Sequence, residues 1–153
     1  MRISKKGEYG LKALIRLALN YEEGTSVTPI NDIAKREGIP QKYLEQILLD
    51  LKKGGILVSK RGVGGGYALS RPPADISLGE AIRIVEGPLV PFGLARAGSQ
   101  VDCDDESGCV LYSVMFEVEN AISNMLDKIS LKDMAKRTLD LIERKRSIHS
   151  YDI

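Results

Sequence analysis

The chain has 153 residues, of which 43% are hydrophobic and 28% charged, and it carries a net charge of +1 at pH 7. This length fits one compact domain, or a small domain with an appendage, and the composition excludes wholesale disorder. No stretch approaches the roughly 20 apolar residues that cross a bilayer, no secretory signal is visible, and two cysteines are too few for a disulfide framework, so we expect a soluble cytoplasmic protein.

The charge is unevenly distributed along the chain. Residues 1–70 hold 12 Lys and Arg against 7 Asp and Glu, whereas residues 71–153 hold 10 against 14. The basic first half indicates a module that binds a polyanion. The acidic second half indicates a separate part of the chain to which this module is attached. Because many solvent-facing surfaces are basic, the meaning of these charges depends on the elements that carry them.

The first part of the chain predicts three helices. Residues 8–21 place apolar side chains at helical spacing. Thr28 and Pro29 give a cap hydroxyl followed by proline at the first helical position of a short second helix, and Gly38 is placed to end it. A third helix is predicted over Gln41–Lys53. Two short helices joined by a tight turn, inside a basic segment, indicate a helix-turn-helix.

The next stretch changes from a helical to a strand-like pattern. Residues 56–58 and 67–69 are runs of strand-forming residues, separated by a basic, glycine-rich loop. Together they predict a β-hairpin, and a hairpin directly after a helix-turn-helix is the wing of a winged helix. Ser77 and Glu80 then have the spacing of a capping box at the start of another short helix.

The second half of the chain predicts a loop followed by two helices. From Pro88 to Cys109 the residues show no periodicity. Beyond Cys109, apolar residues step by four and three positions in turn, as in an a/d helical seam: Leu111, Met115, Val118, Ile122, Met125 and Ile129. A last helix follows from residue 131, and the tail 147–153 is polar.

The first turn of the predicted third helix holds candidate base-reading residues. A recognition helix points its N-terminal end at base edges in the major groove, which selects Gln41, Lys42, Tyr43 and Glu45. Glu45 can accept a hydrogen bond from a cytosine amine. For Tyr43, which shares the apolar stripe, we expect partial burial with its hydroxyl on a phosphate.

The glycine-rich loop favours a different kind of contact. It matches neither a Walker motif nor a dinucleotide-binding motif, because Tyr67 stands where each would need another residue. Glycines such as Gly64 and Gly65 let a hairpin tip approach a sugar–phosphate backbone closely, while Lys60 and Arg61 supply neutralising charge. Arg61 suits insertion into a narrow minor groove. The alternative, an ordinary turn with incidental charge, is weakened by the neighbouring helix-turn-helix.

The sequence contains no catalytic constellation, and we expect no enzyme activity. The only histidine, His149, lies in the polar tail, which leaves no histidine-based triad. Cys103 and Cys109 are six positions apart and could form a bridge, bind a metal jointly or remain free thiols. A structural zinc site needs four protein ligands, and only these two are strong ones. The residues alone leave the three possibilities open and favour free, inert thiols.

Four motifs carry a family resemblance. They are Met-Arg-Ile-Ser-Lys-Lys-Gly-Glu-Tyr-Gly from Met1, Tyr-Leu-Glu-Gln from Tyr43, Arg-Gly-Val-Gly-Gly-Gly-Tyr from Arg61 and Ser-Leu-Gly-Glu-Ala-Ile from Ser77. Together they resemble the IscR/NsrR/CymR family of bacterial winged-helix regulators, over nearly the whole chain. The resemblance implies a homodimer that binds a palindromic operator in double-stranded DNA. Because no apolar run is long enough to cross a bilayer, we expect no membrane partner.

The resemblance also implies a domain organisation for a mainly α fold with a small β-hairpin. A winged helix-turn-helix DNA-binding domain would span 1–87 and a cysteine-containing sensor loop 88–109. Dimerisation helices would span 110–146, with the long 110–129 helix crossing to the partner subunit, and a flexible tail would follow over 147–153.

Many members of that family hold an iron–sulfur cluster on cysteines in the loop before the dimer helix. The resemblance implies Cys103 and Cys109 as metal ligands, joined by Glu8 from the other subunit. Ala97 stands where a further cysteine would fall, which leaves this set short of the usual four protein ligands.

The predicted function is therefore a homodimeric, sequence-specific DNA-binding transcriptional regulator, a repressor, that responds to redox, iron–sulfur or related metabolic status. The first alternative is a cluster-free regulator of the same fold that responds to thiol oxidation or to a partner. The second is a winged-helix protein-interaction module that does not bind DNA, against which the basic loop argues.

Overall fold

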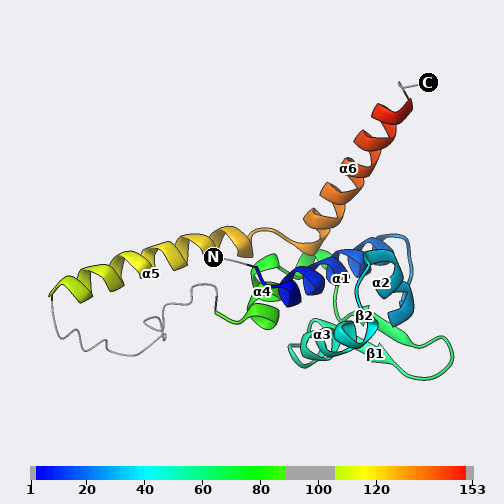
Figure 1. The fold of residues 1–153 in the computed structure, drawn as a ribbon, viewed down its shortest axis with the longest axis horizontal. Coiled ribbons are helices and arrows are strands. Elements are labelled where there is room, and N and C mark those ends of the chain that lie inside the picture. The colour runs from blue at the N-terminus through cyan, green and yellow to red at the C-terminus, as the bar shows by residue number, and fades with distance from the viewer. Residues whose placement is uncertain (1–2, 89–105, 151–153) are drawn as a thin grey trace.

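The computed structural model describes residues 3–88 and 106–150 as six α-helices, one 3-10 turn and one two-stranded antiparallel sheet (Figure 1). In chain order the elements are α1 (Lys5–Glu22), α2 (Ile30–Glu37), α3 (Gln41–Lys53), β1 (Leu57–Lys60), β2 (Gly66–Leu69), η1 (Pro73–Asp75), α4 (Leu78–Glu86), α5 (Glu106–Asp127) and α6 (Leu131–Ser150). The predicted mainly α fold with a small hairpin is confirmed. Among the described residues, no helix is both long and apolar enough to span a membrane.

The hydrophobic core surrounds α1, which contacts α2, α3, α4, α6 and β2. The Ser4 hydroxyl caps α1 by accepting a hydrogen bond from the Gly7 N–H at 3.0 Å. Apolar residues spaced three or four apart along each helix line the interior. The largest fully buried apolar side chains are Leu14, Ile33, Leu44, Ile47, Leu48, Leu51, Ile56, Leu57, Ile76 and Leu131.

The α3 helix and the end of α2 match the sequence prediction. The α3 helix has the predicted bounds Gln41–Lys53, and Gly38 follows α2 in the left-handed conformation, with φ of 65°. Such a conformation ends a helix at little cost only when the residue is glycine. The chain then turns through Ile39, which is buried, and brings α2 and α3 into contact.

The predicted cap of α2 is wrong. The α2 helix begins at Ile30 after Pro29, and no side chain caps it. Thr28 is buried instead and pairs with Tyr67 through both backbone groups, at 2.8 and 2.9 Å, while its hydroxyl accepts a hydrogen bond from Asn20 at 2.8 Å. Thr28 therefore extends the edge of the hairpin, and this pairing requires an extended backbone.

The hairpin has the register expected for a wing. Leu57 lies opposite Leu69, and Lys60 lies opposite Gly66. Leu57 and Leu69 are buried, which fixes one face of the hairpin on the core. The exposed loop 61–65 therefore projects away from the helices (Figure 1).

Ser77 and Glu80 form only half of the predicted capping box. The Ser77 hydroxyl accepts a hydrogen bond from the Glu80 N–H at 3.0 Å, as predicted. The Glu80 carboxylate does not turn back to the cap, because both of its oxygens accept hydrogen bonds from the Arg71 guanidinium at 2.5 Å. A charged partner is preferred over a neutral N–H.

The bounds of both C-terminal helices differ from the prediction. The α5 helix ends at Asp127, so Ile129, the last residue of the predicted seam, follows the helix. The α5 helix begins at Glu106, so Cys109 lies in its first turn and not in a loop. A carboxylate in the first turn is favoured by the helix dipole, which explains the earlier start. The α6 helix continues to Ser150, where the sequence indicated a tail from residue 147, and the hydroxyls of Ser147 and Ser150 donate to backbone carbonyls there.

Candidate nucleic-acid interface

The first turn of α3 presents its polar side chains to solvent. Gln41, Lys42 and Glu45 are exposed, whereas Leu44 between them is fully buried. This alternation follows from the helical repeat, which turns every third or fourth residue towards the core. The turn therefore offers an amide, an ammonium and a carboxylate on one outward surface.

Tyr43 belongs to the same surface and is exposed, at 40%, so it is less buried than the sequence predicted. Its ring meets the Tyr9 ring edge-on, with centroids 5.7 Å apart and planes 81° apart. Aromatic pairs prefer this geometry, so Tyr9 of α1 holds the Tyr43 ring at a defined angle.

Lys60 and Arg61 stand at the hairpin tip, and both are exposed. The loop closes through a hydrogen bond from the Gly65 N–H to the Gly62 carbonyl at 3.0 Å. A side chain at position 65 would collide with the Lys60 carbonyl, and Gly64 has a φ of 73°. Glycine at positions 64 and 65 therefore allows a narrow tip in which the two cations are the dominant polar side chains.

A groove of about 380 Å³ separates the hairpin from α3. Three cations line it: Lys52 of α3, with Lys60 and Arg61 of the hairpin. Its other lining residues carry no charge: Pro29, Ile30, Asn31, Leu49, Ser59, Gly62, Gly65, Gly66 and Tyr67. A groove with three positive and no negative side chains attracts an anion.

Sequence reasoning missed Lys52 as part of this surface. Lys52 lies in the last turn of α3, where its charge complements the helix dipole and needs no further explanation. In the structure its ammonium donates to the Ser59 hydroxyl of β1 at 2.6 Å, which ties α3 to the hairpin. Only the arrangement of α3 beside β1 shows that Lys52 and Arg61 line one groove.

Within one chain, the described residues do not bring the implied iron–sulfur ligands together. Cys109 is disulfide-bonded, so its sulfur is not a free thiolate. Glu8 lies between two ammonium groups, with Lys5 and Lys12 each 2.8 Å away. Hydrogen bonds from Lys12 and Lys5 lower the pKa of Glu8 to about 2, so its carboxylate stays charged and paired at neutral pH.

Over 3–88 and 106–150, no three His, Cys, Asp or Glu side chains gather in a way that would hold a metal ion. Cys103 and Ala97 lie outside the described residues. Within the described part of one chain, the donor set is therefore a disulfide-bonded cysteine and a paired carboxylate.

Comparison with known proteins gives a family match over most of the chain. The Rrf2 family model, described as an iron-dependent transcriptional regulator, matches residues 3–137. A protein of Rhodobacter capsulatus described as an rrf2-like HTH-type transcriptional regulator is 40% identical over 139 residues, covering 86% of this chain and 91% of its own. The HTH-type transcriptional regulator IscR of Xenorhabdus nematophila is 33% identical over 149 residues, covering 96% and 88%.

Solved structures give the same result for the fold. CymR, described as the global cysteine regulator of B. subtilis, superposes with a TM-score of 0.71 at 33% identity and covers 90% of this chain and 98% of its own. T. potens IscR superposes with a TM-score of 0.68 at 36% identity, covering 90% and 88%. The similar proteins are named as transcriptional regulators and not as enzymes.

Proposed function

Because the chain belongs to the Rrf2 family of transcriptional regulators, we propose that it is a homodimeric repressor that binds a palindromic operator in double-stranded DNA. The first turn of α3 enters the major groove, and the hairpin tip reaches the adjacent minor groove. The observation that carries this proposal is the groove between α3 and the hairpin, whose charged lining residues, Lys52, Lys60 and Arg61, are all cations.

The groove fits a stretch of the DNA backbone. Between a helix in the major groove and a hairpin in the minor groove runs one sugar–phosphate strand, which carries one negative charge per nucleotide. Each phosphate neutralised by a cation releases condensed counterions, so the contact is sequence-independent and depends on salt. Sequence is then read at base edges by Gln41, Lys42 and Glu45.

Dimerisation through α5 is supported by the exposure of its apolar side chains. The helix has 22 residues, of which none is buried within its own chain. The exposed apolar residues on α5 include three members of the predicted seam, Leu111, Val118 and Met125, together with Val110, Val114 and Phe116 outside the seam. An a/d seam of this kind is buried when two copies of the helix pack together.

Replacing Arg61 with alanine tests the DNA-binding proposal. The Arg61→Ala dimer loses two wing cations, so we expect operator affinity to fall by about tenfold or more at physiological salt. The slope of affinity against salt concentration is expected to fall by about 2, one for each lost cation. Fluorescence anisotropy over a salt series, with a palindrome selected from random-sequence DNA by the wild-type protein, measures both.

Arg137→Ala is the matched control, because it removes an exposed arginine from α6, away from the hairpin and α3 (Figure 1). Its affinity and salt slope are expected to equal those of the wild type. Unchanged binding by Arg61→Ala would instead favour the winged-helix protein-interaction module.

We propose that the regulator responds to redox conditions through its cysteine thiols, because Cys109 is disulfide-bonded at the start of α5. Reduction of this disulfide by a dithiol takes up two electrons and two protons and yields two thiols. We expect operator affinity to differ at least about fivefold between reduced and oxidised wild-type protein, an ordinary allosteric coupling. Cys109→Ser is expected to show no such difference.

The cluster-binding alternative makes a different prediction for the wild-type protein. In that case protein purified anaerobically with iron present has visible absorbance and bound iron, and Cys109→Ser loses both. Colourless, iron-free wild-type protein with a redox-dependent affinity supports the thiol proposal.

A further inference from the structure

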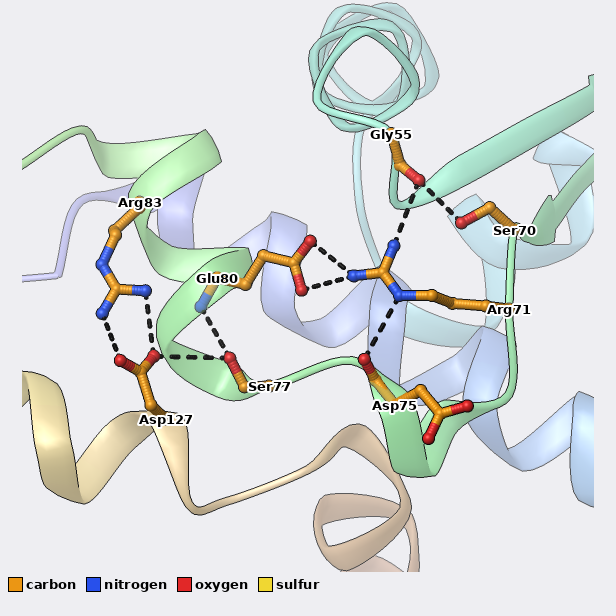
Figure 2. Close-up of polar contacts among 8 residues, drawn as sticks. All are labelled: Gly55, Ser70, Arg71, Asp75, Ser77, Glu80, Arg83 and Asp127. Carbon is orange, nitrogen blue, oxygen red and sulfur yellow. Dashed lines mark hydrogen bonds and ion pairs between the residues drawn. The ribbon is translucent and has the colours of Figure 1, made fainter.

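The last turn of α5 is held to α4 by a group of polar contacts, which we name the α4–α5 joint (Ser77, Arg83 and Asp127; Figure 2). Arg83 of α4 donates two parallel hydrogen bonds to the Asp127 carboxylate, from Nη1 to Oδ1 at 2.9 Å and from Nη2 to Oδ2 at 2.7 Å. The Ser77 hydroxyl also donates to Oδ1, at 3.4 Å. A bidentate contact of this kind fixes the relative orientation of the two side chains as well as the distance between them.

Beside the joint, the backbone fixes a pivot point. The Leu78 N–H donates to the Ile129 carbonyl at 2.7 Å, and the Leu131 N–H donates to the Ile76 carbonyl at 2.9 Å. These two bonds form a single β-bridge between Ser77 and Ser130. One bridge holds a point of the chain in place but leaves a helix that ends just before it able to change direction, so the Arg83–Asp127 pair sets the direction of α5.

The direction of α5 depends on so few contacts because the helix projects away from the winged helix (Figure 1). None of its residues is buried within the chain. Packing within one chain therefore does not lock its angle. The side chains of Arg83 and Asp127 are 40% and 44% exposed, so the pair adds little to the free energy of folding.

A series of hydrogen bonds connects α4, and with it the α4–α5 joint, to the end of α3. Glu80 of α4 binds Arg71. Arg71 donates to the carbonyls of Asp75 and Gly55, at 3.2 and 3.5 Å, and the Ser70 hydroxyl also donates to Gly55, at 2.6 Å (Figure 2). Gly55 follows the C-terminus of α3, so the orientation of α5 is set relative to the helix that we propose enters the major groove.

We propose that Arg83 and Asp127 are positioning residues that set the separation of the two α3 helices in the dimer, and thereby the half-site spacing of the operator. This inference rests on the proposed function. A helix of 22 residues is about 33 Å long, so a rotation of about 10° at one end moves the other end by about 6 Å. That displacement exceeds the rise of about 3.4 Å between successive base pairs.

Gly79 gives an independent means to alter the joint without removing a charge. A Cβ added at Gly79 would collide with the Asp127 carboxylate. Gly79→Ala therefore displaces Asp127 while Arg83 and Asp127 both keep their charge. We expect Gly79→Ala to shift the preferred length of the operator spacer. Variants that lose the ion pair are instead expected to tolerate a wider range of spacer lengths.

The test measures spacing preference and not affinity alone. The DNA probes share one half-site sequence, selected from random DNA by the wild-type protein, and differ in the central spacer by −1, 0, +1 and +2 base pairs. We expect the wild type to lose at least tenfold in affinity for a one-base-pair change. For Asp127→Asn we expect the same one-base-pair change to lower affinity by less than threefold. The affinity of this variant for a single half-site is expected to be unchanged, and sedimentation is expected to show a dimer.

A reversed pair and a matched control complete the experiment. The double variant Arg83→Asp with Asp127→Arg is expected to regain spacing discrimination that each single variant lacks. Glu117→Gln removes an exposed carboxylate from the same helix and is expected to behave as the wild type.

The inference is overturned if dimeric Asp127→Asn keeps the wild-type spacing profile. It is also overturned if that variant is monomeric or unfolded while the wild type is dimeric, because the pair would then act in assembly or folding. A wild-type protein that is monomeric, or that selects no duplex, contradicts the proposed function itself.

Discussion

Val118→Asp is expected to convert the dimer into monomers and to lower operator affinity by about 100-fold or more. Val118 is 41% exposed at the middle of α5 and belongs to the apolar seam. A carboxylate at this position would be buried without a partner in the dimer, which costs several kcal/mol. Each half-site would then bind independently and lose the gain from linking two contacts on one duplex.

Sedimentation velocity and DNA binding by the same sample measure this effect. Ser113→Asp is the control, because it adds the same charge at an exposed position of α5 that lies outside the seam. It is expected to remain dimeric. A Val118→Asp protein that stays dimeric would place the dimer interface elsewhere.

Leu44→Ala is expected to have the largest effect on stability, lowering the free energy of unfolding by about 3 kcal/mol and Tm by about 10 °C. Leu44 is fully buried and anchors the first turn of α3 to the core. Truncation removes apolar contacts and leaves a cavity that the neighbouring side chains fill only in part.

Urea unfolding followed by circular dichroism measures the change. Leu49→Ala on the same helix is the control, because Leu49 is 41% exposed, and we expect it to cost less than about 1 kcal/mol. Equal losses from both variants would contradict the packing of α3 described above.

The sequence predicted the elements that depend on local signals. The bounds of α3 follow from its apolar repeat and the glycines after Lys53, and the end of α2 follows from Gly38. The exposed positions of Gln41, Lys42, Glu45 and Arg61 follow from the same helical and hairpin periods. Each of these signals lies within a few residues of the feature that it specifies.

Contacts between distant segments could not be predicted in this way. Thr28 has the spacing of a helix cap, yet it pairs with Tyr67, far along the chain. Arg83 and Asp127 are 44 positions apart, and nothing in the local sequence of either indicates the other. The start of α5 was missed because glycine, serine and cysteine mask the helical pattern near Glu106.

The hairpin is held firmly at one end and lightly at the other. Its base, where Leu57 lies opposite Leu69, is packed on the core, and Tyr67 of β2 pairs with Thr28 through two backbone bonds. Its tip instead closes on itself from Gly65 to Gly62. In the proposed complex, the tip can therefore adjust to minor grooves of different width while the placement of α3 on the bases stays the same. Natural variation in the loop 61–65 would then change how strongly the protein prefers stiff or flexible DNA in the flanking sequence. The central recognition sequence would stay the same.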